Sequence, residues 1–375
     1  MSAYPMIDGF TDPRFAPLRA AFASCFADGL EHGGAVAVVI DGKLVADLWG
    51  GHADKARSKP WTRDTLANVW SASKGVVALA VAMLVERGAL RYDDPVAKVW
   101  PEFAAKGKER ITLDLVLSHQ AGLNGLDAEM DEAGLYAWHP YANALAAMAP
   151  LWEPGSRCVY HALSYGHLAG EPIRRVSRMS VGRFVMREIA APLGAAFYFG
   201  LPEALDPLAA EMIEGPKASD WVAAALAGPY PHACRNPTPL ATQPNARGWR
   251  AAEIPGGNGQ SHARALAAIY GNTVGGAKPL ISRATLTEAT RPRFAGIDSC
   301  FGSPVAYGAG LRIDDASHGG RGVGTFGHSG WGGAVAFGDP AARMGFAYVT
   351  NTMLGFDDGI DPRRQRLIDA VYDAL

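Results

Sequence analysis

Strand patterns lie near both ends of this 375-residue chain, and they constrain its fold more than any other feature. In residues 35–49, two apolar segments flank Asp41-Gly42, a pair that favours a type I′ turn because both of its positions need positive φ. A second pair of apolar segments lies in residues 333–350, around a Gly-Asp-Pro turn signal at residues 338–340. We therefore predict two hairpins that meet in one antiparallel sheet assembled from both termini.

Apolar residues at helical spacing flank these strands. One predicted helix near the N-terminus carries an apolar stripe of Leu18, Phe22, Cys25 and Phe26. Another is predicted near the C-terminus, with Asp361 as its N-cap and Pro362 at its first helical position. The stripe of this second helix comprises Leu367, Ile368, Val371, Tyr372 and Leu375. Residues 307–313 (YGAGLRI) predict one further strand.

The middle of the chain has a different pattern. Apolar residues fall mostly at helical spacing from about residue 113 to 270, and residues 202–257 are rich in Pro, Gly and Ala, which indicates irregular loops with short helices. We predict an α/β (α+β) fold: a discontinuous domain of residues 1–110 plus 271–375 holds the sheet and its flanking helices. Residues 111–270 form a mainly helical inserted domain. A cleft between two such parts is a usual place for a small-molecule site.

Charge and cysteine content exclude several classes of function. Lys and Arg total 35 and Asp and Glu total 37, so the chain offers no basic surface for nucleic acid or an anionic membrane. The longest apolar run, residues 75–85, is far shorter than the roughly 20 residues that span a bilayer. The N-terminal segment has no leader pattern. The cysteines are far apart and lack zinc-like spacing, which favours reduced thiols in a cytoplasmic protein: Cys25, Cys158, Cys234 and Cys300.

Cofactor and metal motifs are also missing. Residues 322–327 (GVGTFG) satisfy GxGxxG, but a strand pattern follows them instead of a helix, so no phosphate would meet a helix N-terminus. The chain has no GxxxxGK, HExxH or GxSxG motif, and its ten histidines are scattered. We therefore expect no cofactor and no metal.

Residues 70–87 (WSASKGVVALAVAMLVER) carry the most informative motif. Ser71 and Lys74 form S-x-x-K at the start of a helix that is apolar almost all round and hence buried. Positions i and i+3 share one helical face, so the amine can reach the hydroxyl. Burial lowers the pKa of a lysine, as a lysine base requires. The alternative is that Ser71 or Ser73 is only an N-cap and that Lys74 extends to solvent.

Further segments in a fixed order give this motif its context. They are ITLDLVLSHQAGL (residues 111–123), WEPGSRCVYHALSYG (residues 152–166) and GHSGWGGAVAFGDP (residues 327–340). With the N-terminal hairpin and WSASKG, the chain resembles the serine β-lactamase and penicillin-recognising superfamily over nearly its whole length. The resemblance is strongest to class C β-lactamases and the related family VIII carboxylesterases.

The resemblance implies roles for individual residues. Ser71 matches the nucleophile, Lys74 its proton-accepting partner, and Tyr160 the tyrosine that shares the base role and relays a proton to the leaving alcohol. An oxyanion hole is implied from the backbone N–H groups of Ser71 and Trp331. The alternative for Tyr160 is a core aromatic residue with a satisfied hydroxyl.

A second set of residues is implied to bind substrate. His328-Ser329-Gly330 matches the K-T/S-G strand of the family, with His in place of Lys. Ala162 stands where many penicillin-handling members have Asn. A site without that cation and amide favours neutral esters over anionic β-lactams. Trp152 and Trp331 are expected to line an acyl or alcohol pocket, and Tyr136 and Trp138 are further candidates. The alternative for each of these four residues is packing in the core or at its rim.

Together these features predict a serine carboxylesterase that hydrolyses small to medium neutral esters through an acyl-enzyme on Ser71. The alternatives within enzymes are a β-lactamase, a D-amino-acyl peptidase or an acyltransferase that uses the same nucleophile. An alternative from another class is a non-catalytic penicillin sensor or scaffold, which would have no chemical need of Ser71, Lys74 and Tyr160. We expect a small-molecule ester as the partner, with no nucleic acid, no membrane and no obligate protein partner.

Overall fold

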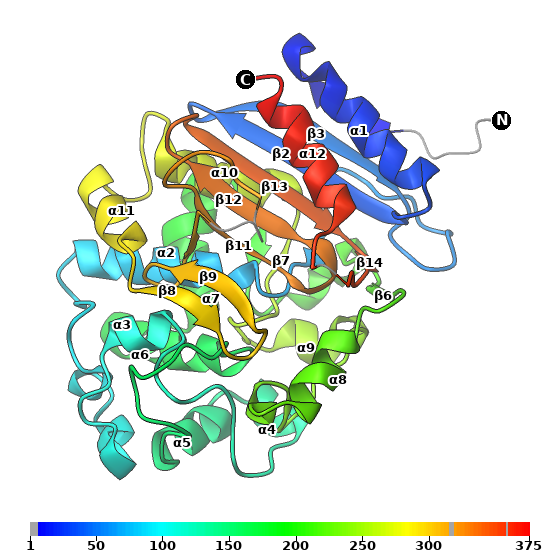
Figure 1. Cartoon of the computed structure of the whole chain (residues 1–375). Helices are drawn as coiled ribbons and strands as arrows, with labels where there is room; N and C mark the ends of the chain where they lie inside the picture. The colour runs from blue at the N-terminus through cyan, green and yellow to red at the C-terminus, as the bar shows by residue number, and fades with distance from the viewer. Residues whose placement is uncertain (1–6, 315–318, 358) are drawn as a thin grey trace.

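A nine-stranded antiparallel sheet organises the computed structural model, which describes residues 7–314, 319–357 and 359–375 (Figure 1). The strand order is β1-β3-β2-β13-β12-β11-β10-β9-β8. The strands from the N-terminal part are β1 (Ile7–Thr11), β2 (Gly33–Ile40) and β3 (Lys43–Gly51). Those from the C-terminal part are β8 (Phe294–Asp298), β9 (Ser303–Tyr307), β10 (Arg312–Ile313), β11 (Phe326–Ser329), β12 (Val335–Asp339) and β13 (Met344–Thr350).

The two ends of the chain meet in the pairing of β2 with β13, where Val38 lies opposite Phe346. This confirms the predicted sheet built from both termini. The β2–β3 hairpin turns at Asp41 and Gly42 with φ of 51° and 75°, so both positions have the positive φ that a type I′ turn requires.

Two strand predictions were wrong in detail. Gly338 and Asp339 still pair within the β12–β13 ladder, so the turn of this hairpin comes later, at residues 340–343. Residues 307–313 are two strand ends and a turn, because Gly310 adopts a φ of 80° and reverses the chain between β9 and β10.

Alternate residues of the central strands face opposite layers, as the period of two in a strand requires. Val36 and Val38 pack with the terminal helices α1 (Ala16–Ala27) and α12 (Pro362–Tyr372). Ala35 and Ala37 face α10 (Ala263–Val274) on the other side. Figure 1 shows α1 and α12 together over one face of the sheet. Both terminal helices were predicted, and the Asp361 side chain caps α12 by accepting from the backbone N–H of Arg363.

The remaining helices gather beyond the other face of the sheet around α2 (Ser73–Glu86), which packs against α6, α7 and α11. They are α3 (Leu113–Leu117), α4 (Glu132–Tyr136), α5 (His139–Ala147), α6 (Ser164–Ser177), α7 (Val181–Val185), α8 (Asp220–Ala227), α9 (Arg247–Ala251) and α11 (Arg283–Thr290). Two small sheets complete this part, formed by β4 (Ala67–Asn68), β7 (Gln260–Ser261) and β5 (Phe197–Tyr198), and by β6 (Ile213–Glu214) and β14 (Thr352–Met353).

The division into residues 1–110 plus 271–375 and residues 111–270 stays a prediction. Helix α10, most of which this division gives to the helical part, packs on β13, β2 and β12 of the sheet. Within the described ranges, each helix is too short or too polar to cross a membrane. Residues 1–6, part of the segment in which a leader was sought, lie outside the described residues.

Candidate active site

Ser71 lies two positions before the first residue of α2, and its side chain does not cap that helix. Ala72 occupies the N-cap position and makes no side-chain cap hydrogen bond. The hydroxyl of Ser73 instead accepts a 2.9 Å hydrogen bond from the backbone N–H of Gly259. Lys74 is fully buried and does not reach solvent. The alternative of a capping serine with a solvent-exposed lysine is therefore wrong.

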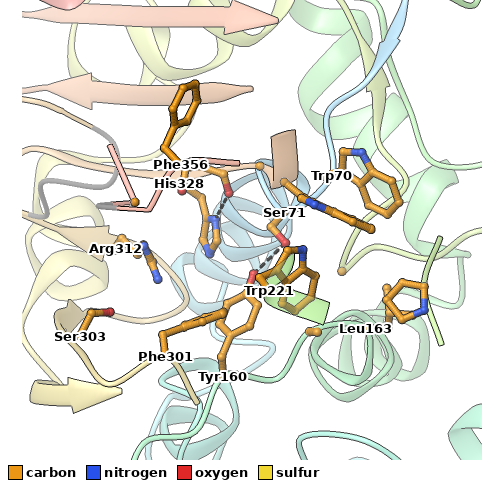
Figure 2. Close-up of a pocket in the computed structure, with 18 of the residues that line it drawn as sticks. Trp70, Ser71, Tyr160, Leu163, Trp221, Phe301, Ser303, Arg312, His328 and Phe356 are labelled. Carbon is orange, nitrogen blue, oxygen red and sulfur yellow. Dashed lines mark hydrogen bonds between the residues drawn. The ribbon is translucent and has the colours of Figure 1, made fainter. Parts of the chain in front are cut away.

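The hydroxyl of Ser71 contacts both side chains that the S-x-x-K and tyrosine motifs pointed to. Its Oγ lies 2.9 Å from Nζ of Lys74 and accepts a 2.7 Å hydrogen bond from Oη of Tyr160. Figure 2 shows Ser71 and Tyr160 pointing toward one another across the pocket. Lys74 also donates a 2.6 Å hydrogen bond to the carbonyl oxygen of Gly256. The three predicted catalytic side chains thus form one connected group.

Burial gives the lysine and the tyrosine complementary protonation states. It lowers the pKa of Lys74 well below its ordinary value, and the charge of Arg312 lowers it further. Burial raises the pKa of the Tyr160 phenol. Both shifts favour the uncharged forms, an amine that can accept a proton and a phenol that holds one.

Asp298 and His119, which were not among the predicted site residues, contact Tyr160. The carboxylate of Asp298, at the end of β8, accepts a 3.3 Å hydrogen bond from the backbone N–H of Tyr160 and a 2.8 Å one from that of Cys300. The rings of His119 and Tyr160 lie 4.9 Å apart. Asp298 has no local sequence signal, because its link to Tyr160 spans 138 positions.

The His328-Ser329-Gly330 motif ends β11 beside the nucleophile. A Cβ on Gly330 would lie 2.2 Å from the carbonyl oxygen of Val69, so only glycine allows this strand to approach so closely. His328 is buried, and its Nδ1 lies 2.7 Å from the carbonyl oxygen of Ser329. Trp331 follows at the start of a short 3-10 turn, Trp331–Gly333.

A cavity of about 540 Å³ opens over this group, a size usual for small-molecule sites. Six of the predicted site residues line it: Ser71, Tyr160, His328, Ser329, Gly330 and Trp331. Lys74 is not part of the lining but contacts Ser71, which is. Ala162, the position where related enzymes have Asn, also lines it.

Four aromatic residues of the cavity form a continuous surface, which we call the aromatic wall: Trp70, Trp331, Trp221 and Phe301. The ring centroids of Trp70 and Trp331 lie 4.6 Å apart, those of Trp331 and Trp221 5.3 Å, and those of Trp221 and Phe301 6.1 Å. Offset and edge-on contacts of this kind are favourable between aromatic rings. Of these four residues, only Trp331 was predicted to line a pocket.

Three aromatic predictions were wrong, because these residues do not line this cavity. Trp152 packs edge-on against His161 and Tyr230 and lines a separate depression. Trp138 donates to the buried carboxylate of Glu171. Tyr136 lies edge-on to the ring of Trp249. The direction of an aromatic side chain depends on the tertiary packing of its segment. Closeness to a motif in the sequence does not reveal that direction.

The premise that this site lacks a cation was also wrong. Arg312 and Arg364 line the cavity, together with Asp357, whose carboxylate is paired with Lys217 at 2.5 Å. The β10–β11 pairing places Arg312 opposite Gly327, and Arg312 lines the same cavity as His328. Neither arginine belongs to a motif, so the sequence offered no signal for them.

No group of three or more His, Cys, Asp or Glu side chains in the described part of the chain is arranged to hold a metal ion. The arrangement around Ser71 can instead support nucleophilic attack by a hydroxyl, with a neutral amine and a phenol beside it.

Comparison with known proteins places the chain among serine hydrolases and penicillin-binding relatives. A family model described as Beta-lactamase matches residues 21–370. The chain is 35% identical over 364 residues to the Esterase/beta-lactamase LipL of Mycobacterium tuberculosis (strain ATCC 25618 / H37Rv), which covers 92% of this chain and 83% of that protein.

Two solved structures are similar over almost the whole chain. A family VIII carboxylesterase is 40% identical, with a TM-score of 0.92, covering 99% of this chain and 100% of its own. A penicillin-binding protein homologue from Caulobacter crescentus is 39% identical, with a TM-score of 0.87 and the same coverage.

Proposed function

Because this chain belongs to the beta-lactamase family, we propose that the cavity over Ser71 is the active site of a serine carboxylesterase. The chain is a serine hydrolase whose relatives include a family VIII carboxylesterase and an esterase/beta-lactamase. The roles of individual residues are our proposal. One observation carries them: the hydroxyl of Ser71 lies within hydrogen-bond distance of both Lys74 and Tyr160.

In the first step, Ser71 Oγ attacks the ester carbonyl carbon and its proton moves to the neutral amine of Lys74. The resulting oxyanion is stabilised by the backbone N–H groups of Ser71 and Trp331. The tetrahedral intermediate collapses, the bond to the alcohol oxygen breaks, and Tyr160 donates its proton to that oxygen. The ammonium of Lys74 then returns its proton to the phenolate of Tyr160, which leaves an acyl-enzyme with both groups in their starting states.

Water completes the cycle. It attacks the acyl carbon while the Lys74–Tyr160 pair accepts one of its protons, and the bond to Ser71 Oγ breaks as that oxygen is reprotonated. The products are one carboxylic acid and one alcohol, and both titratable groups return to their starting states. The pKa directions support this assignment, because burial favours a neutral lysine and a protonated tyrosine.

The aromatic wall favours an apolar acyl or alcohol group on the substrate. A cavity of about 540 Å³ suits small to medium esters. Neutral esters are our first substrate class. The cations of Arg312 and Arg364 favour a second candidate class, esters or β-lactams that carry a carboxylate.

We also propose a cytoplasmic location and a small-molecule ester as the partner. All four cysteines are free thiols, which is the normal state in a reducing compartment. An acyl acceptor other than water would make the same site an acyltransferase.

The decisive experiment measures hydrolysis of p-nitrophenyl butyrate and of a chromogenic cephalosporin by the wild type and by Ser71→Ala, Lys74→Ala and Tyr160→Phe. Ser24→Ala, on α1 and away from the cavity, is the matched serine control. We expect ester turnover that Ser71→Ala abolishes and Ser24→Ala leaves intact. Full ester turnover by Ser71→Ala would disprove the nucleophile. Fast cephalosporin turnover without ester turnover would establish a β-lactamase, and no turnover of either would favour a sensor or scaffold.

A further inference from the structure

A buried arginine on α12 connects the C-terminal helix to the turn that follows the His-Ser-Gly motif. Arg363 is fully buried in the first turn of α12. Its guanidinium donates to both carboxylate oxygens of Asp361, at 3.1 and 2.8 Å, and lies 3.9 Å from the buried carboxylate of Glu31. It also donates to three backbone carbonyl oxygens, those of Leu30, Thr352 and Gly332.

The contact with Gly332 is the one that reaches the active site. Nη2 of Arg363 lies 2.8 Å from this carbonyl oxygen, and Gly332 directly follows Trp331. The backbone N–H of Leu354 donates to the same oxygen at 3.3 Å. The turn after Trp331 is therefore fixed to α12 and to the segment around β14.

Two glycines form the turn, which is closed by backbone hydrogen bonds from Gly330 N–H to the Ala334 carbonyl and from Gly333 N–H to the Gly330 carbonyl. Gly332 and Gly333 adopt φ of 83° and 135°, a region that glycine enters freely and that no side chain restrains. A Cβ on Gly333 would lie 2.5 Å from Nη2 of Arg363 and 3.0 Å from a carboxylate oxygen of Asp361. The guanidinium and its carboxylate thus pack directly against the backbone of the turn.

Stability alone does not account well for such a group. A buried ion pair often contributes no more to stability than well-packed apolar side chains, because both charges lose their hydration. An oxyanion hole, in contrast, depends on N–H groups held in place before the reaction begins. A displacement of about 1 Å in such a site can cost roughly 100-fold in rate.

We propose that Arg363 is a positioning residue for the esterase reaction: it holds the carbonyl of Gly332, two peptide units after the Trp331 N–H, and so restricts the turn that carries this N–H. The inference rests on the proposed function, in which that N–H stabilises the oxyanion. Arg363 itself touches no substrate, because it is buried beneath the turn and does not line the cavity.

The test compares Arg363→Met and Arg363→Lys with Arg366→Met. Arg366 lies on the same helix and is partly exposed, with its ion partner Asp28 far outside the cavity lining. The kcat and KM for p-nitrophenyl butyrate are measured per active site, by end-point titration with a fluorophosphonate. The inhibition constant of an alkyl boronic acid, whose hydroxyl occupies the oxyanion hole of its Ser71 adduct, is measured in parallel.

We expect Arg363→Met to lower kcat per titrated site by 10- to 100-fold, to leave KM within threefold, and to weaken boronic acid inhibition by a factor similar to the loss in kcat. Arg363→Lys should show a smaller loss, because its ammonium keeps the charge and can still donate to Asp361 or Gly332. Some loss should remain, because one ammonium cannot reach both in the same way. Arg366→Met should match the wild type. If Arg363→Met does not fold, Arg363→Lys and Asp361→Asn provide the same readouts.

Wild-type kcat and boronic acid affinity per titrated site in a folded Arg363 variant would overturn the proposal and assign the residue to stability alone. A raised KM with unchanged kcat would overturn it as well. Failure of the proposed function is distinguishable, since it would appear as ester turnover in Ser71→Ala whatever the Arg363 variants do.

Discussion

Lys74 donates a 2.6 Å hydrogen bond from Nζ to the carbonyl oxygen of Gly256, a residue 182 positions further along the chain. A neutral amine can use one hydrogen for this contact and direct its lone pair at Ser71 Oγ, 2.9 Å away. The loop of Gly256 can come this close to the start of α6 because glycine has no side chain. A Cβ at this position would lie 2.8 Å from the carbonyl oxygen of Leu163. The carbonyl of Gly256 would therefore orient Lys74 if it acts as the proposed base.

The pH dependence of kcat/KM tests this base. Lys74 must be neutral to accept the proton, and burial holds its pKa well below the ordinary value. Activity should be retained above that lowered pKa and be lost as the pH falls through it. Lys74→Met should lower kcat by roughly 100- to 10,000-fold, the usual range for general base catalysis. A pH–rate profile of kcat/KM with an unchanged acid limb in Lys74→Met would contradict the assignment.

Removing the phenol of Tyr160 tests the proton donor. Tyr160→Phe keeps the ring and deletes only the hydroxyl that contacts Ser71 at 2.7 Å. We expect kcat to fall by roughly 100- to 10,000-fold with little change in thermal stability. Tyr92→Phe is the control, because this buried hydroxyl has no hydrogen-bond partner among the residues that the structure describes and lies outside the cavity lining. Equal kcat values for the two variants would remove Tyr160 from the mechanism.

The aromatic wall should decide how well an apolar group binds. Trp221→Leu removes part of that wall, and we expect KM for p-nitrophenyl esters to rise about 5- to 30-fold, which corresponds to roughly 1–2 kcal/mol of lost apolar contact. Trp152→Leu is the matched control, since Trp152 contacts His161 and Tyr230 instead of the cavity. The comparison fails if Trp152→Leu raises KM as much as Trp221→Leu does.

Arg312 should affect substrate charge preference and the base at once. Arg312→Met is expected to lower kcat/KM at least tenfold for an ester carrying a carboxylate relative to its neutral methyl-capped analogue. The charge of Arg312 also lowers the pKa of Lys74, so its removal should raise that pKa and move the acid limb to higher pH. Competition kinetics with the two esters and a pH–rate profile measure these effects. An unchanged ratio would show that substrate carboxylates do not contact Arg312.

Several features were predictable because short-range chemistry determines them. Asp41-Gly42 specified its turn, since both residues tolerate positive φ. Asp361-Pro362 marked the start of α12, since an N-cap and a first-turn proline act within one turn of helix. Ser71 and Lys74 predicted their own contact, since positions i and i+3 share a helical face.

Other features depended on which segments meet in space. Asp298 behind Tyr160, the carbonyl of Gly256 beside Lys74, and Arg312 in the cavity all come from segments far away in sequence. The prediction that Trp152 lines the cavity was wrong for the same reason, because the sequence near a motif does not show the direction of an aromatic side chain.

In the sequence by itself, the spacing of Ser71 and Lys74 predicted their contact, and turn chemistry with the alternation of apolar residues predicted the sheet that joins the termini. Tyr160 and the proposed roles of all three side chains came from the resemblance to the serine β-lactamase superfamily, because no local pattern links Tyr160 to Ser71. Only the tertiary structure decided the charge of the cavity, the make-up of the aromatic wall and the contact of Arg363 with the carbonyl of Gly332. Those properties arise from long-range packing, where a residue's surroundings are set by strands and helices that no local pattern specifies.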